Sequence, residues 1–302
     1  MVQADTVPTD LGEAVLDRAV TAYAEALGDR LVAGYALGSL AHGGFSPLVS
    51  DVDLGLILAD PLQASDQETI GAVADAVRAS GPGLPERLSV FWGTPSTLRG
   101  QVPGGRFPPL DRLDLLKHGR LLTGRDVRQA AAQPDRAELL VAGARFALGS
   151  LTGTGAETGT GSGTETGTGT GSGTGTPAGA TVLDDIRMPS RLVASGPRRL
   201  TKTVLFPVRF LYTAATGQAG LTSLAVEHYL ATQGAPGAAL VTAALGWRTE
   251  PPADSGAATA LAGRELIPLY LHYIDDHVTR LLAVGQDELA GRFRQWRARL
   301  LA

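Results

Sequence analysis

Two aspartates separated by one residue mark the segment of this sequence with the clearest potential for chemistry. Asp51 and Asp53 open a mostly apolar run that predicts a β-strand over Asp51–Leu58. On a strand, residues i and i+2 project to the same face, so the two carboxylates point together while Val52 and Leu54 point into the core. Like charges held this close repel each other unless a cation lies between them. Because Mg²⁺ is typically held by one or two carboxylates and substrate phosphates, the pair is a candidate magnesium site.

A glycine and a serine precede this pair, at the end of another apolar run. The run Leu31–Leu37 predicts a buried strand that ends at Gly38 and Ser39, and a loop rich in Gly, Ser and Pro leads on to Asp51. Gly38 lets the backbone approach a phosphate without a Cβ in the way. Ser39 can donate its hydroxyl, and its N–H is expected at a helix start, where anions are favoured. The segment therefore predicts a phosphate-binding turn next to a metal site.

This order of elements resembles the signature of the DNA polymerase β-type nucleotidyltransferase superfamily: an apolar strand, Gly-Ser, a loop, and then Asp-apolar-Asp-apolar. The branch that it looks most like is the aminoglycoside adenylyltransferases of the streptomycin/spectinomycin type. The segment Val204–Gly217 also resembles a helix of that branch that carries a nucleotide-phosphate arginine, and Arg209 stands at the matching position. The resemblance implies that a nucleoside monophosphate moves from a nucleoside triphosphate, usually ATP, to a hydroxyl of a small molecule such as an aminoglycoside-like antibiotic. Pyrophosphate is released, and Mg²⁺ is the implied cofactor.

The resemblance also implies a role for each matching residue. Asp51 and Asp53 would hold the metals, and Gly38 and Ser39 would grip the β- and γ-phosphates. Arg209 would neutralise charge on these phosphates from the helical domain. The lysine that the family carries after Thr-Gly is missing from 218–222, and Lys202 is a further candidate for the phosphates because of its place relative to Arg209. These two lie seven residues apart and so about two turns apart on one helical face.

A third carboxylate is usual in active members of this superfamily, on a later strand, where it shares a metal or deprotonates the attacking hydroxyl. The matching strand is predicted over Arg87–Trp92, and Glu86 at its start is the only acid there. Glu86 is either the catalytic base or a solvated turn residue, and both interpretations stay open. General-base help is typically worth about 10²–10⁴-fold, so a chain without it would bind nucleotide yet catalyse poorly.

The acceptor molecule stays open. The streptomycin-type enzymes resemble one another in reading their cationic drug partly with an acidic residue just before the arginine-bearing helix. Here Gly196–Arg199 contains no acid, and the nearest acids upstream are Asp184 and Asp185. This position therefore gives no support for a polycationic antibiotic.

Two functions of other classes compete with a small-molecule transferase. One is a nucleotide-binding regulatory or protein-modifying module. A third carboxylate at the site and release of pyrophosphate would favour the small-molecule transferase over this module. The other is polymerisation or addition to tRNA ends. No Lys/Arg-rich run is present, which argues against nucleic acid as the main partner.

A low-complexity segment divides the chain. Residues 151–180 contain 11 Gly and 10 Thr and cannot bury enough apolar surface to offset their conformational entropy, so we expect a flexible linker. Residues 1–150, where predicted helices and strands mix, would form the nucleotidyltransferase catalytic domain, and residues 181–302 a helical C-terminal domain. The expected fold class is α+β: a small mixed sheet with flanking helices, followed by an all-α domain.

Hydrophobic periodicity gives the elements in more detail. Pro207 should kink or break the helix in which it lies. The sequence Asp275-Asp276-His277 is expected on a solvated helical face, and 119–126 as a short strand without chemistry. The predicted helices are 11–27, 65–79, 111–118, 135–148, 198–215, 221–232, 236–246, 265–284 and 287–300.

Composition excludes several classes of site and partner. The 302 residues contain no cysteine, which excludes disulfides, cysteine zinc sites and thiol catalysis. The net charge is −4 and 44% of residues are hydrophobic, enough for a sizeable core. The polar start and the lack of an apolar run of roughly 18 residues lead to the expectation of a cytoplasmic protein without a membrane partner.

Overall fold

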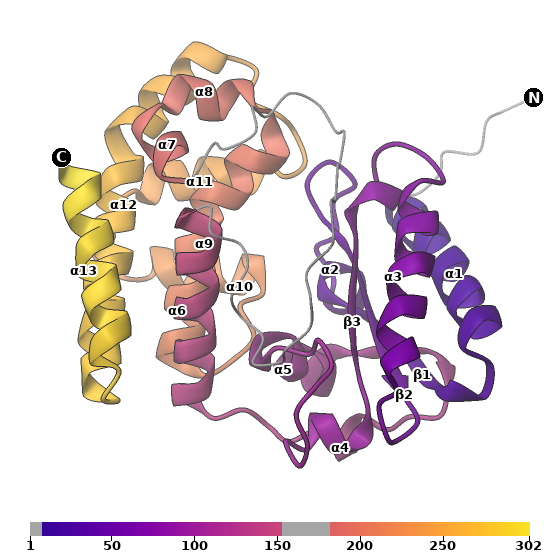
Figure 1. The fold of residues 1–302 in the computed structure, drawn as a ribbon. Helices are drawn as coiled ribbons and strands as arrows, with labels where there is room; N and C mark the ends of the chain where they lie inside the picture. Colours follow the sequence, from indigo (N-terminus) through magenta and orange to yellow (C-terminus); the bar gives the residue numbers. More distant parts are fainter. Residues whose placement is uncertain (1–7, 153–181) are drawn as a thin grey trace, which may run out of the picture. The chain divides into compact units, whose positions relative to one another are not determined.

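The computed structural model describes residues 8–152 and 182–302 (Figure 1). They form two compact units, which divide between Pro134 and Asp135. Except for residues 151 and 152, the predicted linker lies outside the described residues. Within the described ranges, no helix is both long enough and apolar enough to cross a membrane.

The first unit contains a mixed sheet, which in residues 8–134 has four strands in the order β3-β2-β1-β4. β1 pairs antiparallel with β2 and β4, and β2 pairs parallel with β3. The three main predicted strands are confirmed, with ends that differ by at most one residue, and the fourth lies within the short strand expected over 119–126. The strands are β1 (Leu31–Leu37), β2 (Val52–Leu58), β3 (Leu88–Gly93) and β4 (Arg120–Gly124).

Helices cover both faces of this sheet. On one face, α1 and α3 bury an apolar stripe that includes Leu16 and Ile70 against β2 residues such as Leu54. On the other face, Leu98 of α4 and Leu115 of α5 pack against β1 and β2. Complete burial of such side chains stabilises a fold by roughly 1.5–3 kcal/mol each, so the two faces are fixed by their packing. The helices are α1 (Pro8–Leu27), α2 (Gly38–His42), α3 (Ala64–Arg78), α4 (Pro95–Leu98) and α5 (Pro109–His118).

The second unit, in its described residues, is built from helices alone. Its core joins α9, α12 and α13 through large buried side chains such as Tyr270, Phe293 and Trp296. Leu140, Ala144 and Leu148 of α6 also pack into this core, so the helix that precedes the Gly/Thr segment belongs by its contacts to the helical unit. The helices are α6 (Arg136–Thr152), α7 (Val182–Arg187), α8 (Pro189–Ala194), α9 (Pro197–Thr216), α10 (Thr222–Leu230), α11 (Ala238–Gly246), α12 (Ser255–Ala283) and α13 (Asp287–Leu301).

Of the two outcomes expected at Pro207, a kink or a break, the break is wrong, because α9 runs continuously through this residue. A proline at this position removes the N–H that would bond to the carbonyl of Thr203, four residues earlier. The hydroxyl of Tyr270 donates to that carbonyl at 2.8 Å. The freed acceptor is therefore satisfied by α12, and the helix can continue.

The expectation of a solvated face at His277 is also wrong. The His277 side chain is 1% exposed, and its ring stacks on Phe293 with centroids 5.8 Å apart. Burial disfavours the charged imidazolium and lowers the pKa of His277 to about 4, against the opposing pull of Asp276. The helix also begins ten residues before the predicted 265, at Ser255, where the Asp254 side chain caps it. At the level of class, the predicted α+β fold with a helical C-terminal region is confirmed.

Candidate active site

The two aspartates lie at the start of β2, on the face of the sheet that α5 covers. Val52 and Leu54 are buried in the core beneath α1 and α3, whereas Asp51 and Asp53 are half-buried. Because side chains alternate along a strand, Asp53 projects to the opposite face from Leu54. Asp51 directly precedes the first residue of the strand. The burial pattern therefore agrees with two carboxylates that share one face.

The Gly-Ser turn lies directly against this pair. Gly38 begins α2 immediately after β1 and has a φ of +59°, which favours glycine. A Cβ at this position would collide with Oδ2 of Asp53. Leu37, the residue before it, is the register partner of Asp53 in the antiparallel pair. The glycine thus lets the turn approach the carboxylate, and half-buried Ser39 follows in α2.

An arginine fixes the loop that leads into Asp51. The Arg87 guanidinium donates to the carbonyls of Pro47 at 2.8 Å and Leu48 at 3.2 Å. It also reaches the carbonyl of Ser50 at 3.4 Å. The buried Ser50 hydroxyl in turn accepts from the N–H of Ser46 at 3.0 Å. Arg87 therefore acts from the start of β3 on the loop that positions the aspartates.

Glu86 is placed in a turn ahead of β3. It lies in the 3₁₀ helix Pro85–Arg87, is exposed, and accepts from the N–H of Gly83 at 3.1 Å. On β3 itself, the residue in register with Asp53 is Ser89. The strand next to the aspartates therefore presents a hydroxyl, not a carboxylate, at this position.

Two further acids reach the site from α5, and the sequence analysis missed both. Oδ2 of Asp114 accepts the N–H of Gly38 at 2.7 Å. Asp111, one turn earlier, is half-buried, and burial followed by the negative charges of Asp53 and Asp114 raises the pKa of Asp111 to about 7. The signal that could have found them is their i, i+3 spacing on a predicted helix, which puts both on one helical face.

A positive charge accompanies these carboxylates. The Arg106 guanidinium lies over the ring of Phe91, 5.5 Å from its centroid, and donates to the carbonyl of Val90 at 3.1 Å. Its charge opposes the rise in the pKa of Asp111. Arg106 is thus held by β3 at the side of the sheet that carries the aspartates.

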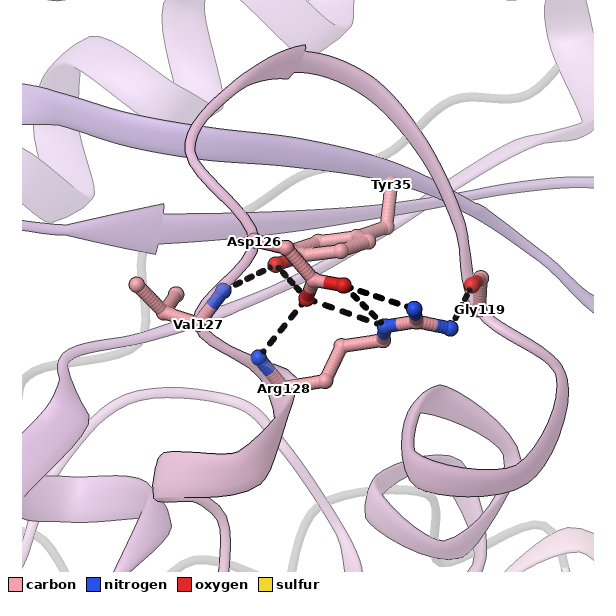
Figure 2. A network of polar contacts seen from close by, with 5 residues as sticks. All are labelled: Tyr35, Gly119, Asp126, Val127 and Arg128. Atoms are coloured by element: carbon pink, nitrogen blue, oxygen red, sulfur yellow. Dashed lines mark hydrogen bonds and ion pairs between the residues drawn. The ribbon is translucent and has the colours of Figure 1, made fainter.

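A polar network anchors Tyr35 of β1, the strand that ends at the glycine turn (Figure 2). The Tyr35 hydroxyl donates to Asp126 at 3.0 Å and accepts the N–H of Val127 at 2.7 Å. Arg128 pairs with Asp126 at 2.7 Å, holding the pKa of that carboxyl below its usual range, and donates to the carbonyl of Gly119 at 2.5 Å. Burial raises the pKa of Tyr35 to about 12, so its hydroxyl stays a donor at neutral pH. The segment after β4 is therefore a structural anchor.

The aspartate pair fits a magnesium ion that is shared with a substrate. Within the described ranges, no group of three or more His, Cys, Asp or Glu side chains lies close enough to hold a metal ion. Mg²⁺ usually binds one or two carboxylates and completes its octahedron with phosphates and water. Asp51 and Asp53 offer two half-buried carboxylates, and Oδ2 of Asp53 takes the place that a Cβ on Gly38 would need.

The two predicted basic residues lie on α9 of the helical unit. Lys202 and Arg209 are both exposed. Nε of Arg209 donates to the carbonyl of Gly220 at 2.6 Å, and a Cβ on Gly220 would lie 2.8 Å from the carbonyl of Arg209. Arg248, which the sequence analysis missed, lies near enough that the charge of Arg209 adds to burial in lowering the pKa of Arg248. Within the helical unit, Arg209 thus belongs to a pair of neighbouring cations.

No protein-family model and no curated protein matches the chain. Among solved structures, the chain is similar to a spectinomycin adenyltransferase from Enterococcus faecialis, in a crystal structure with ATP and spectinomycin. The similarity covers 84% of this chain and 98% of that chain, at 10% sequence identity and a TM-score of 0.49.

Proposed function

We propose that this protein is a magnesium-dependent nucleotidyltransferase. It takes a nucleoside triphosphate, with ATP as the first candidate, transfers the nucleoside monophosphate to a hydroxyl of a small molecule, and releases pyrophosphate. The observation that carries this proposal is the approach of the Gly38 turn to the Asp53 carboxylate, on the face of the sheet that also carries Asp51. A turn without a Cβ beside two carboxylates suits a phosphate chain whose charge is shared with a cation.

Each residue has a definite task in this proposal. Asp51 and Asp53 bind the metal, which supplies charge neutralisation at the reacting phosphate when it is bound. Gly38 allows the triphosphate to approach the turn, and Ser39 donates its hydroxyl to a phosphate oxygen. The N–H of Gly38 is directed at Asp114, so the contribution of this glycine is its missing side chain.

The helical unit contributes positive charge in the same proposal. Arg209 neutralises charge on the β- and γ-phosphates, as the sequence resemblance implies, and Lys202, seven residues earlier on the same helix, assists it. Their exposure on one helix supports this assignment, since an exposed guanidinium can present its fork to a phosphate. The sequence signature offers Glu86 as the proton acceptor, but the proposed transfer does not depend on which acid takes the proton.

A regulatory or protein-modifying module is the second candidate. The observation that favours it is Ser89, because the strand beside the aspartates carries a hydroxyl where a third carboxylate could act. Such a protein binds magnesium nucleotide and is stabilised by it, but it transfers nothing to a small molecule. Ligand binding to the folded state raises the melting temperature in either case, so only turnover separates the two candidates.

Pyrophosphate release from Mg-ATP tests the proposal. Wild type is assayed with a panel of aminoglycosides and other hydroxyl-bearing small molecules, beside Asp53→Ala. We expect release that depends on an acceptor and is abolished in Asp53→Ala. Full turnover by Asp53→Ala would refute the assignment of the site. A rise in melting temperature with Mg-ATP and no release with any acceptor would favour the regulatory module.

A further inference from the structure

We propose that Asp111 of α5 is the third carboxylate of this site and accepts the proton of the attacking hydroxyl, in place of Glu86. This inference rests on the proposed nucleotidyl transfer and names a further catalytic residue for it.

Asp111 lies on the side of α5 that faces the sheet. Asp111, Asp114 and Leu115 are spaced i, i+3 and i+4, so they share one face of the helix. Leu115 is fully buried against Tyr35 and Leu37 of β1. The face of α5 that carries Asp111 is therefore the face that packs on the sheet.

The same side of the sheet carries the metal-binding pair. Leu54 packs beneath α1 and α3, so the neighbouring Asp53 projects to the α5 side. Gly55, two residues along β2 from Asp53, confirms this side: its Cβ would lie 3.1 Å from Leu37 Cδ1 and 3.3 Å from Phe107 Cζ. Asp53 and Asp111 thus project from two elements into the same layer.

A hydrogen bond fixes α5 against the turn between them. The N–H of Gly38 donates to Oδ2 of Asp114 at 2.7 Å, and a Cβ on the same glycine would collide with Oδ2 of Asp53. The His42 and His118 rings, at the ends of α2 and α5, meet edge to face at 5.6 Å. Asp114 therefore anchors the helix. Asp111, one turn earlier, lies near enough to Asp53 that the negative charge of Asp53 adds to burial in raising the pKa of Asp111.

The Glu86 carboxylate has a hydrogen-bond partner in its own turn. It accepts the N–H of Gly83 within the turn before β3, and the side chain is exposed. Three residues later, Ser89 is the residue of β3 that stands in register with Asp53. The neighbouring strand therefore supplies no carboxylate opposite Asp53, and α5 supplies one from above the sheet.

In the proposed transfer, one bond forms at the α-phosphorus, one bond breaks there, and Asp111 accepts a proton. The hydroxyl oxygen of the acceptor forms a bond to the α-phosphorus, and the bond from that phosphorus to the oxygen that bridges the α- and β-phosphates breaks. Pyrophosphate leaves with the electron pair of that bond. The hydroxyl proton passes to the Asp111 carboxylate, which releases it to solvent after the products leave.

The test compares Asp111→Asn with Glu86→Gln, and uses Glu68→Gln, an exposed acid of α3, as the control. Two quantities are measured for each variant: equilibrium binding of Mg-ATP, and pyrophosphate release with water and with the acceptor panel. Thermal melting of each variant establishes that it is folded. We expect Asp111→Asn to bind Mg-ATP at least as tightly as wild type, because it loses a negative charge near the triphosphate, and to release pyrophosphate about 10²–10⁴-fold more slowly.

The outcomes separate this inference from the proposed function. Glu86→Gln and Glu68→Gln are expected to keep wild-type rates. An active wild type whose rate falls in Glu86→Gln but holds in Asp111→Asn overturns the inference and leaves the proposed function intact. Weaker Mg-ATP binding in Asp111→Asn also overturns it, since a proton acceptor is not needed for binding. A wild type that releases no pyrophosphate overturns the proposed function, and the inference with it.

Discussion

The backbone N–H of Gly38 donates a hydrogen bond of 2.7 Å to Oδ2 of Asp114, so the glycine turn and α5 are held together. Asp53 lies against the same glycine, on the side where a Cβ would stand. One residue without a side chain therefore sits between an acid of β2 and an acid of α5. The geometry of the site depends on this point, and it can be disturbed by a single methyl group.

Gly38→Ala should damage both stability and nucleotide binding. The positive φ costs about 1–2 kcal/mol for a residue with a Cβ, and the collision with Asp53 adds to it. Gly28→Ala is the matched control, because its φ of +50° is similar and its Cβ would meet nothing within 4 Å. Urea unfolding and Mg-ATP titration should show a larger loss in Gly38→Ala than in Gly28→Ala. Equal losses of stability and unchanged binding would contradict the contact with Asp53.

Arg87→Gln should weaken Mg-ATP binding, although the proposed site gives Arg87 no contact with the nucleotide. Arg87 bonds to the carbonyls of Pro47, Leu48 and Ser50, and hydrogen bonds of a charged group contribute about 1.5–3 kcal/mol. Their loss should lower the free energy of unfolding by about this amount and loosen the loop before Asp51. Arg99→Gln, at an exposed residue of the same unit, should change neither quantity. If Arg87→Gln binds Mg-ATP like wild type, the loop does not position the aspartates.

The sequence predicts the sheet and the glycine turn well because both are local patterns. Leu31–Leu37 is mostly apolar and is followed by a glycine, and β1 has these same bounds. The i, i+3 spacing of Asp111 and Asp114 puts both on one face of a predicted helix, but the sequence does not show that this face meets the glycine turn, because that depends on how α5 packs across the sheet. The predictions of a helix break at Pro207 and of a solvated His277 are wrong for the same reason, because each depends on a contact with an element distant in the sequence. The Tyr270 hydroxyl donates to the carbonyl of Thr203 that Pro207 leaves free, and Phe293 covers the imidazole of His277.

The charge state of Asp111 should make stability depend on pH in buffer without divalent ions. Burial and the charges of Asp53 and Asp114 raise the pKa of Asp111 from 3.8 to about 7 in the folded state. Between these values the folded state binds a proton that the unfolded state does not, so this residue makes stability fall as pH rises from about 4 to about 7. Asp111→Asn lacks this effect. Its free energy of unfolding, relative to wild type, should therefore rise over this interval and level off above it.

Urea unfolding of both proteins at several pH values, with a chelator present, measures this difference. A constant difference from pH 4 to 8 would show that Asp111 titrates as it does in the unfolded chain.

Tyr35→Phe should lower the free energy of unfolding by about 1–2 kcal/mol, because it leaves the N–H of Val127 and the Asp126 carboxylate without their shared partner. A double-mutant cycle with Asp126→Asn measures the coupling between the two side chains. We expect the double variant to be more stable than the sum of the single losses predicts. Strictly additive losses would mean that the network in Figure 2 does not act as a unit.

Binding of ATP in the presence and absence of Mg²⁺, measured by calorimetry, tests the central claim most directly. The variants are Asp51→Asn, Asp53→Asn and, as the control, Asp60→Asn, whose exposed carboxylate lies just beyond the other end of β2. We predict that wild type and Asp60→Asn bind ATP only with Mg²⁺, and that each of the other two variants loses at least about tenfold in affinity, which is 1.4 kcal/mol. ATP binding that needs no divalent ion, or that survives both substitutions unchanged, would contradict a magnesium-nucleotide site at this pair.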